Sequence, residues 1–238
     1  VAAPGEIDEA RRELLTELAA FVALHPDGVH ANRISAAIWP RGVDADVRDS
    51  ALAQLSRWFG TTSDGQPVLV EESGVWRVSP GAVNLDWDGF RGSLNGAADH
   101  PMDAEQYLRT ALGMVRGEPF TDVPAQRYSW LESSTIVADI GLAIALSTTA
   151  TSELAIARDD LAAARETILR GLELMPANEE LWCSLLQLEA RAGDAQALRD
   201  TADRMYAEVP AYGPSQRVSS RTNALVEELI PGYRVRAA

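Results

Sequence analysis

The sequence predicts a mainly α-helical protein in two parts, with three helices and a β-hairpin ahead of an array of helical hairpins. Helical periodicity up to about residue 60 gives way to two short apolar runs, and then resumes to the end of the chain. In the second part, the stretches that begin at Asp160 and Asp194 align without a gap, 34 residues apart. We therefore expect one domain over residues 1–91 and another over residues 92–238.

The first domain is expected to be a winged helix-turn-helix. Helices are predicted over residues 6–24, from 30 or 32 to 39, and from 44 or 46 to 59, with Pro or Gly in the turns that follow them. Two β-like runs, Pro67–Glu71 and Val75–Val78, lie on either side of Ser73-Gly74, as the strands of a hairpin lie on either side of its turn.

The third helix would be the recognition helix of such a domain. At 100° per residue, its apolar face holds Val47, Ala51, Leu55 and Trp58, with Leu52 and Phe59 at the edge. The opposite face holds Asp46, Asp49, Ser50, Ala53, Ser56 and Arg57. That outer face has one cation and two anions, whereas a DNA-reading surface needs cations near phosphates.

Six side chains are candidates for DNA contacts: Arg33, Arg41, Arg48, Gln54, Arg57 and Arg77. Residues 27–79 contain five Arg against seven Asp and Glu, a balance of −2. Because this is not a basic patch, we expect at most weak binding to double-stranded DNA.

A short helix capped by Asp86 is expected at the junction of the two domains, over residues 85–92, and a linker over residues 92–101 follows it. Helices are then expected over residues 102–116, from 126 into the 150s, and over 160–174, 179–192, 195–209 and 215–229. The last helix and the tail after it would cap the array.

A fixed 34-residue interval is the period of the tetratricopeptide helical hairpin. The matched pairs are Asp160 and Asp194, Ala163 and Ala197, and Pro176 and Pro210. We expect the Ala pair to allow close helix approach and the Pro pair to lie just past helix ends. The alternative is an ordinary antiparallel helix bundle.

The composition of the chain limits the classes of partner that it is expected to bind. The formal net charge is −14, and all 21 basic residues are Arg, a usage typical of a GC-rich genome. Strong acidity disfavours non-specific nucleic-acid and anionic-membrane binding, and predicts a basic protein or peptide partner for the helical array. No run approaches the ~20 apolar residues of a spanning helix, so direct membrane contact is not expected. Cys183 is the single cysteine and is expected to be a small core residue.

No catalytic motif is present, so we expect no enzymatic activity, no cofactor and no metal site. His25 and His30 lie on either side of a turn, where helix-end positions explain them. The Asp159-Asp160 and Glu179-Glu180 pairs fit helix starts, where negative charge is favourable.

Three strings carry a family resemblance: ALHPDGVHANRISAAIWP, VRDSALAQLSRWFG and VWRVSPGAVNLDWDGF. They resemble the winged helix of the bacterial transcriptional activator family, also called the SARP type. The resemblance covers nearly the whole chain and implies a tetratricopeptide-like activator domain after the winged helix. It is closest to a branch in which these modules form the C-terminal part of larger, sometimes membrane-tethered, proteins. The implied location is the cytoplasm, free or tethered through an upstream region.

Two functions follow from these observations. In the first, the protein is a transcription regulator whose winged helix contacts DNA and whose helical array receives a signal or partner. In the second, a degenerate winged helix acts with the repeats purely as a protein-interaction module. The resemblance favours the first function, and the charge of the third helix favours the second.

Overall fold

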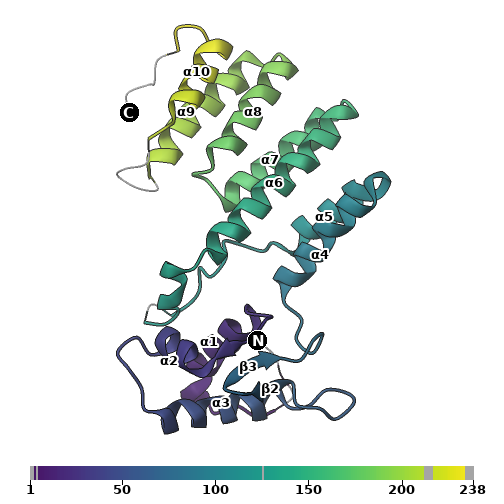
Figure 1. The fold of residues 1–238 in the computed structure, drawn as a ribbon. Coiled ribbons are helices and arrows are strands. Elements are labelled where there is room, and N and C mark those ends of the chain that lie inside the picture. The colour runs from purple at the N-terminus through teal and green to yellow at the C-terminus, as the bar shows by residue number, and fades with distance from the viewer. Residues whose placement is uncertain (1–2, 4, 125, 212–216, 234–238) are drawn as a thin grey trace. The chain divides into compact units, whose positions relative to one another are not determined.

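A computed structural model describes residue 3 and residues 5–124, 126–211 and 217–233 (Figure 1). The chain forms two compact units. Unit 1 comprises Val1–Asp88 and Phe120–Val137, and unit 2 comprises Gly89–Pro119 and Ala138–Ala238. The expected division into 1–91 and 92–238 did not include a return of the chain to unit 1.

Unit 1 contains the expected three helices and hairpin. Its elements are η1 (Glu9–Arg11), α1 (Arg12–Ala23), β1 (Val29–His30), α2 (Ala31–Ile38), α3 (Ala45–Phe59), β2 (Leu69–Glu72), β3 (Val75–Val78) and η3 (Ser129–Ser133). The strands form an antiparallel sheet in the order β1-β3-β2, with Val29 opposite Trp76 and Leu69 opposite Val78. The sequence did not predict β1, because two residues between helices carry no alternating pattern.

The turn between β2 and β3 is tight. Ser73 and Gly74 both have positive φ, 54° and 81°, as the two central residues of a type I′ hairpin turn require. The Gly74 N–H donates to Glu71 Oε1 over 2.6 Å. The wing of this domain therefore ends in a two-residue turn beside two glutamates.

The core of unit 1 is formed by α1, α2, α3 and the sheet. The side chains that are at most 3% exposed include Leu15, Leu18, Val22, Val29, Ile34, Leu52, Leu55, Trp58 and Leu69. Helix α3 thus packs one face against α1, and its other face is exposed to solvent.

A segment distant in sequence completes this core. We call the described residues of 120–134 the strap. Tyr128 and Trp130 of the strap are each 7% exposed within the core of unit 1. The carboxylate of Glu17 on α1, itself 1% exposed, accepts the Tyr128 N–H at 2.6 Å and lies 3.3 Å from Arg127 Nη1. The expectation of a helix from residue 126 was therefore wrong: Tyr128 has φ 61°, and the long helix starts at Ile136.

Burial raises the pKa of Tyr128 to about 12, and the nearby charge of Glu17 adds to the shift. A raised folded-state pKa means that the neutral phenol is favoured in the folded protein, so its contribution to stability is complete below the unfolded pKa of 10. We expect the unfolding free energy of unit 1 to fall as pH rises from 10 to about 12. Denaturant titrations across this range should show the fall, and Tyr128→Phe should show less of it; equal slopes for both proteins would contradict the assignment.

Unit 2 is a stack of helices. Its elements are α4 (Asp86–Asp99, entered from unit 1), η2 (Pro101–Asp103), α5 (Ala104–Met114), α6 (Ile136–Ala157, also entered from unit 1), α7 (Leu161–Leu174), α8 (Glu179–Ala192), α9 (Ala195–Ala211) and α10 (Ser220–Leu229). Helix α8 packs against α7, α9 and α10 (Figure 1). The core includes Ala164, Ile168, Leu181, Trp182, Leu186, Ala202 and Met205, each at most 1% exposed.

The expected linker over residues 92–101 is wrong, because residues 92–99 are helical and belong to α4. Gly96 within this stretch and Gly89 just before it serve helix packing, whereas a Cβ on Gly92 would meet nothing within 4 Å. A Cβ on Gly96 would lie 2.5 Å from Tyr107 Cε1 of α5, and one on Gly89 would lie 3.2 Å from Met114 Sδ. Small residues that let two helices approach were thus mistaken for a flexible connection.

Two expectations about the repeat residues also need correction. Pro176 follows α7 as expected, but Pro210 lies inside α9 rather than past its end. Ala163 and Ala197 are only half-buried, whereas Ala164 and Ala202 are fully buried. The close approach of α6 and α7 instead depends on Gly171, where a Cβ would lie 2.7 Å from Thr148 Cγ2.

This contact predicts the effect of Gly171→Ala. In an open helix the change stabilises by about 1 kcal/mol through helix propensity. Here the added methyl group would overlap Thr148 on α6 and lie 3.0 Å from Leu181 Cδ1 on α8, so we expect a net loss of about 1–2 kcal/mol. Urea unfolding measures the change, with Gly113→Ala as the control because a Cβ there meets nothing within 4 Å. A stabilised Gly171→Ala variant would contradict the packing.

Helix α6 is the most apolar element. Over its 22 residues it is long and apolar enough to cross a membrane by length and composition, although core helices share both properties. Ser147, Thr148 and Thr151 are buried, and each hydroxyl donates to the carbonyl one turn earlier in the helix. The Ser and Thr side chains thereby reach the core of unit 2 with their donors satisfied.

Candidate functional site

The outer face of α3 is the first candidate surface. Asp46, Asp49, Ser50, Ala53 and Arg57 are exposed, as the helical projection predicted. Val47 was expected on the core face, but it is 51% exposed, because the packed residues of α3 begin one turn later, at Ala51. The outer face thus has two carboxylates, one guanidinium and an exposed valine.

Several of the arginines predicted to contact DNA are already paired with a neighbouring carboxylate or backbone carbonyl. Arg48 forms an ion pair with its neighbour on α3, with Nε 2.7 Å from Asp49 Oδ1. On the hairpin, Arg77 Nη2 lies 3.3 Å from Glu72 Oε2. Arg57 Nε donates to the Ala53 carbonyl at 3.4 Å, a long bond.

The other three predicted residues lie on α3, on α2 and in the turn after α2. Gln54 Nε2 donates to Ser50 Oγ at 3.4 Å within α3. Arg33 on α2 has Nη2 3.3 Å from His25 Nε2, and Arg41 is exposed in the turn after α2. Five of the six predicted residues therefore have a polar partner within unit 1. His25 and His30 take helix-end roles as expected, because His25 Nδ1 lies 2.6 Å from the Phe21 carbonyl oxygen and His30 Nδ1 accepts the Asn32 N–H.

The residues before α1 pack against the end of α3. The Gly5 N–H donates to the Trp58 carbonyl at 3.0 Å, which holds this segment against the last turn of α3. A Cβ on Gly5 would lie 2.4 Å from the Arg57 carbonyl oxygen, so the contact requires glycine. A hollow beside it is lined by Glu6, Ile7, Asp8, Arg11, Leu15, Gln54 and Arg57. No local sequence pattern marks this contact, because it joins two segments about 50 residues apart.

In unit 2 the two repeat aspartates make the same contact. Asp160 Oδ1 accepts the Ala163 N–H at 3.0 Å, and Asp194 Oδ1 accepts the Ala197 N–H at 2.9 Å. Each side chain caps the start of its helix, α7 or α9. This local role explains the matched Asp and Ala spacing.

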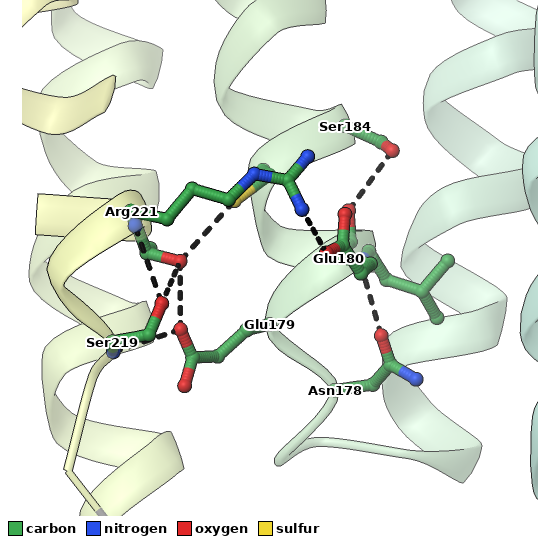
Figure 2. A network of polar contacts seen from close by, with 9 residues as sticks. Asn178, Glu179, Glu180, Ser184, Ser219 and Arg221 are labelled. Atoms are coloured by element: carbon green, nitrogen blue, oxygen red, sulfur yellow. Dashed lines mark hydrogen bonds and ion pairs between the residues drawn. The ribbon is translucent and has the colours of Figure 1, made fainter. Parts of the chain in front are cut away.

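The start of α8 carries the polar network shown in Figure 2. Glu179 Oε2 accepts the Ser219 N–H at 3.0 Å and the Thr222 hydroxyl at 2.6 Å, while Arg221 Nη1 lies 2.7 Å from Glu180 Oε1 (Figure 2). Burial alone would raise the pKa of Glu179, but the hydrogen bonds from Thr222 and Ser219 outweigh burial and lower the pKa. The network fixes α10 to α8.

The described residues of the two units form no catalytic arrangement. Cys183 is half-buried with its Sγ 3.5 Å from Thr222 Oγ1, and burial raises the pKa of its thiol, which disfavours the reactive thiolate. Within the described ranges, no cluster of three or more His, Cys, Asp or Glu side chains could hold a metal ion.

The fold defines a two-part protein: a winged helix followed by an array of stacked helical hairpins. The chain belongs to the family of the bacterial transcriptional activator domain, whose sequence profile matches residues 90–209. This family is one of transcriptional activators.

A solved structure agrees on the fold. The chain is similar to Mycobacterium tuberculosis EmbR, in a complex with a low-affinity phosphopeptide, with a TM-score of 0.68 and 18% sequence identity. The similarity covers 92% of this chain but only 59% of the EmbR chain. Both proteins therefore have N-terminal helices with a small antiparallel sheet, followed by a helical array. No curated protein matches the sequence.

Proposed function

We propose that this chain is a regulatory protein that acts chiefly through protein contacts of its helical array, while its winged helix binds DNA weakly and with little sequence preference. The observation that carries the proposal is the outer face of α3. Asp46 and Asp49 are exposed there, and Arg48 is paired with Asp49. Carboxylates near phosphates are repelled and release no counterions, so they lower affinity for every DNA sequence.

The wing supports the same conclusion. A two-residue turn gives it little reach, and Glu71 and Glu72 lie immediately before that turn. Glu72 also neutralises Arg77, the cation of β3 that the sequence suggested for backbone contacts. Neither α3 nor the wing therefore presents an unopposed group of cations.

Sequence-specific DNA binding is the second candidate function, and the family favours it. Family members are transcriptional activators, and this chain keeps the helix-turn-helix order with α3 in the recognition position. In that case Arg33, Arg41 and Arg57 would supply the phosphate contacts, after rearrangement of the exposed side chains.

Asp46→Asn/Asp49→Asn separates the two candidates, because it removes the repulsion without changing side-chain size. We expect its affinity for a random duplex to rise on the order of fivefold at low salt, from two Coulomb terms of about 0.5 kcal/mol each. Fluorescence anisotropy measures the affinity. Glu208→Gln/Glu228→Gln is the control, since it changes the net charge equally on α9 and α10. An equal gain in the control would assign the effect to overall charge, and no gain in either would remove the proposed role of α3.

The partner of the helical array is proposed to be a peptide. EmbR was crystallised with a phosphopeptide, but this chain spans only 59% of EmbR, so the complex supports a peptide as the class of partner without giving its place on this chain. The acidity of the protein favours a basic peptide.

A further inference from the structure

A groove in unit 2 runs between the end of α5, the length of α7 and the end of α8. Its volume of about 910 Å³ falls in the range of ligand sites, and is far larger than an ion or a water molecule needs. Half-buried apolar side chains line it, including Val115, Leu161 and Leu169. Such a groove can accept the apolar face of a helical segment.

A buried carboxylate lies in the wall of this groove. Glu189 on α8 is 2% exposed and lines the groove. Arg165 Nε lies 2.8 Å from Glu189 Oε1 and balances its charge, yet Oε1 accepts no hydrogen bond of acceptable geometry. A buried polar atom without a hydrogen bond is costly, so a donor brought by a ligand would gain more here than at the surface.

The other buried carboxylate of the described chain makes the contrast clear. Glu17 in unit 1 accepts a hydrogen bond from the Tyr128 backbone and another from Arg127. The carboxylate oxygens of Glu17 thus already accept hydrogen bonds from the strap. Glu189 Oε1 is instead paired with Arg165, whose side chain is 46% exposed and therefore screened by solvent. Burial raises the pKa of Glu189, against the opposing charge of Arg165.

The charges around the groove favour a cationic ligand. Glu166, Glu173 and Asp194 line it together with Glu189, against Arg116, Arg165 and Arg170, which gives four acids and three bases, a balance of −1. An ammonium or guanidinium group at Glu189 would meet a carboxylate with an open acceptor. A phosphate there would meet that same carboxylate at close range.

We propose that this groove binds an amphipathic helical segment of a partner protein, and that a Lys or Arg within the apolar face of that segment donates to Glu189. The apolar side chains of the segment cover Leu161, Leu169 and Val115. The inference deepens the proposed protein-interaction role of the helical array, on which it rests. It adds the chemistry of the partner and the carboxylate that selects it.

The test selects peptides from a display library of about 16 random residues against the full chain, and then titrates a labelled synthetic copy of the strongest binder by anisotropy. We expect the selected sequences to share one Lys or Arg among Leu or Ile residues at helical spacing. Glu189→Gln should weaken the binder about tenfold, and Leu169→Arg should abolish binding, while Glu208→Gln on α9 should leave it unchanged. Thermal melts of each variant confirm that unit 2 remains folded.

A double-mutant comparison assigns the contact. Replacing the basic residue of the peptide by norleucine should weaken binding to the native chain about tenfold, with little further loss on Glu189→Gln. Additive losses would overturn the assigned contact. Selection of acidic or phosphorylated peptides, of peptides insensitive to Leu169→Arg, or of none would overturn the groove assignment. The DNA measurements on α3 are independent of this selection, and a binder that maps elsewhere on unit 2 would leave the protein-interaction role standing.

Discussion

Trp182→Ala is expected to lower the unfolding free energy of unit 2 by about 3–5 kcal/mol, the range for truncating a buried aromatic side chain. Trp182 is 1% exposed in the first turn of α8, a helix that contacts α7, α9 and α10. Its Nε1–H donates to the Pro176 carbonyl at 2.7 Å, and the Arg204 guanidinium lies 5.4 Å from the ring centroid. Loss of the indole would thus open a cavity and leave the Pro176 carbonyl without this donor.

Urea unfolding followed by circular dichroism measures this loss. Trp182→Phe is the matched control, because it removes the N–H donor but keeps most of the apolar volume, at a cost of about 1–2 kcal/mol. If Trp182→Ala cost no more than the Phe variant, the indole could not be the packing centre of the array.

Glu17→Ala should be the next most damaging change, with an expected loss of about 2–4 kcal/mol in unit 1. The substitution leaves the Tyr128 N–H buried without an acceptor and Arg127 without its carboxylate. Because Glu17 joins α1 to the strap, amide exchange in the described part of residues 120–134 should rise by more than in the helices of unit 1.

Glu17→Gln tests the electrostatic part of this contact. Burial is the largest influence on Glu17 and raises its pKa, so the ionised form costs stability as pH rises above the unfolded value of 4.5. The Gln variant cannot ionise, so its stability relative to the native chain should improve from pH 4 to pH 7. A constant difference over that range would show that Glu17 is not the group responsible.

The sequence predicted the elements that depend on local pattern. The three helices, the hairpin and the helical array are confirmed, because apolar periodicity and Gly-Pro turns are local properties. The helix caps of Asp160 and Asp194 likewise follow from one side chain and the backbone three residues later. Where glycine was involved, local pattern misled: Gly96 looks like a linker residue until Tyr107 is placed against it.

The candidate sites depend more on long-range contacts. The contact of Gly5 with Trp58 and that of Glu17 with Tyr128 join segments far apart in sequence, and no local pattern marks them. The sequence did not predict the burial of Glu189 either, since a glutamate near the end of an amphipathic helix is usually exposed. In contrast, the acidic outer face of α3 followed from helical geometry alone.

The salt dependence of DNA binding by the unmodified chain tests the central claim most directly. Each phosphate neutralised contributes about −0.9 to the slope of log affinity against log salt. We predict a slope no steeper than about −2 and equal affinities, within a few-fold, for random and direct-repeat duplexes. A slope steeper than about −5, together with a sub-micromolar preference of 100-fold or more for one duplex, would contradict the account and identify α3 as a working recognition helix.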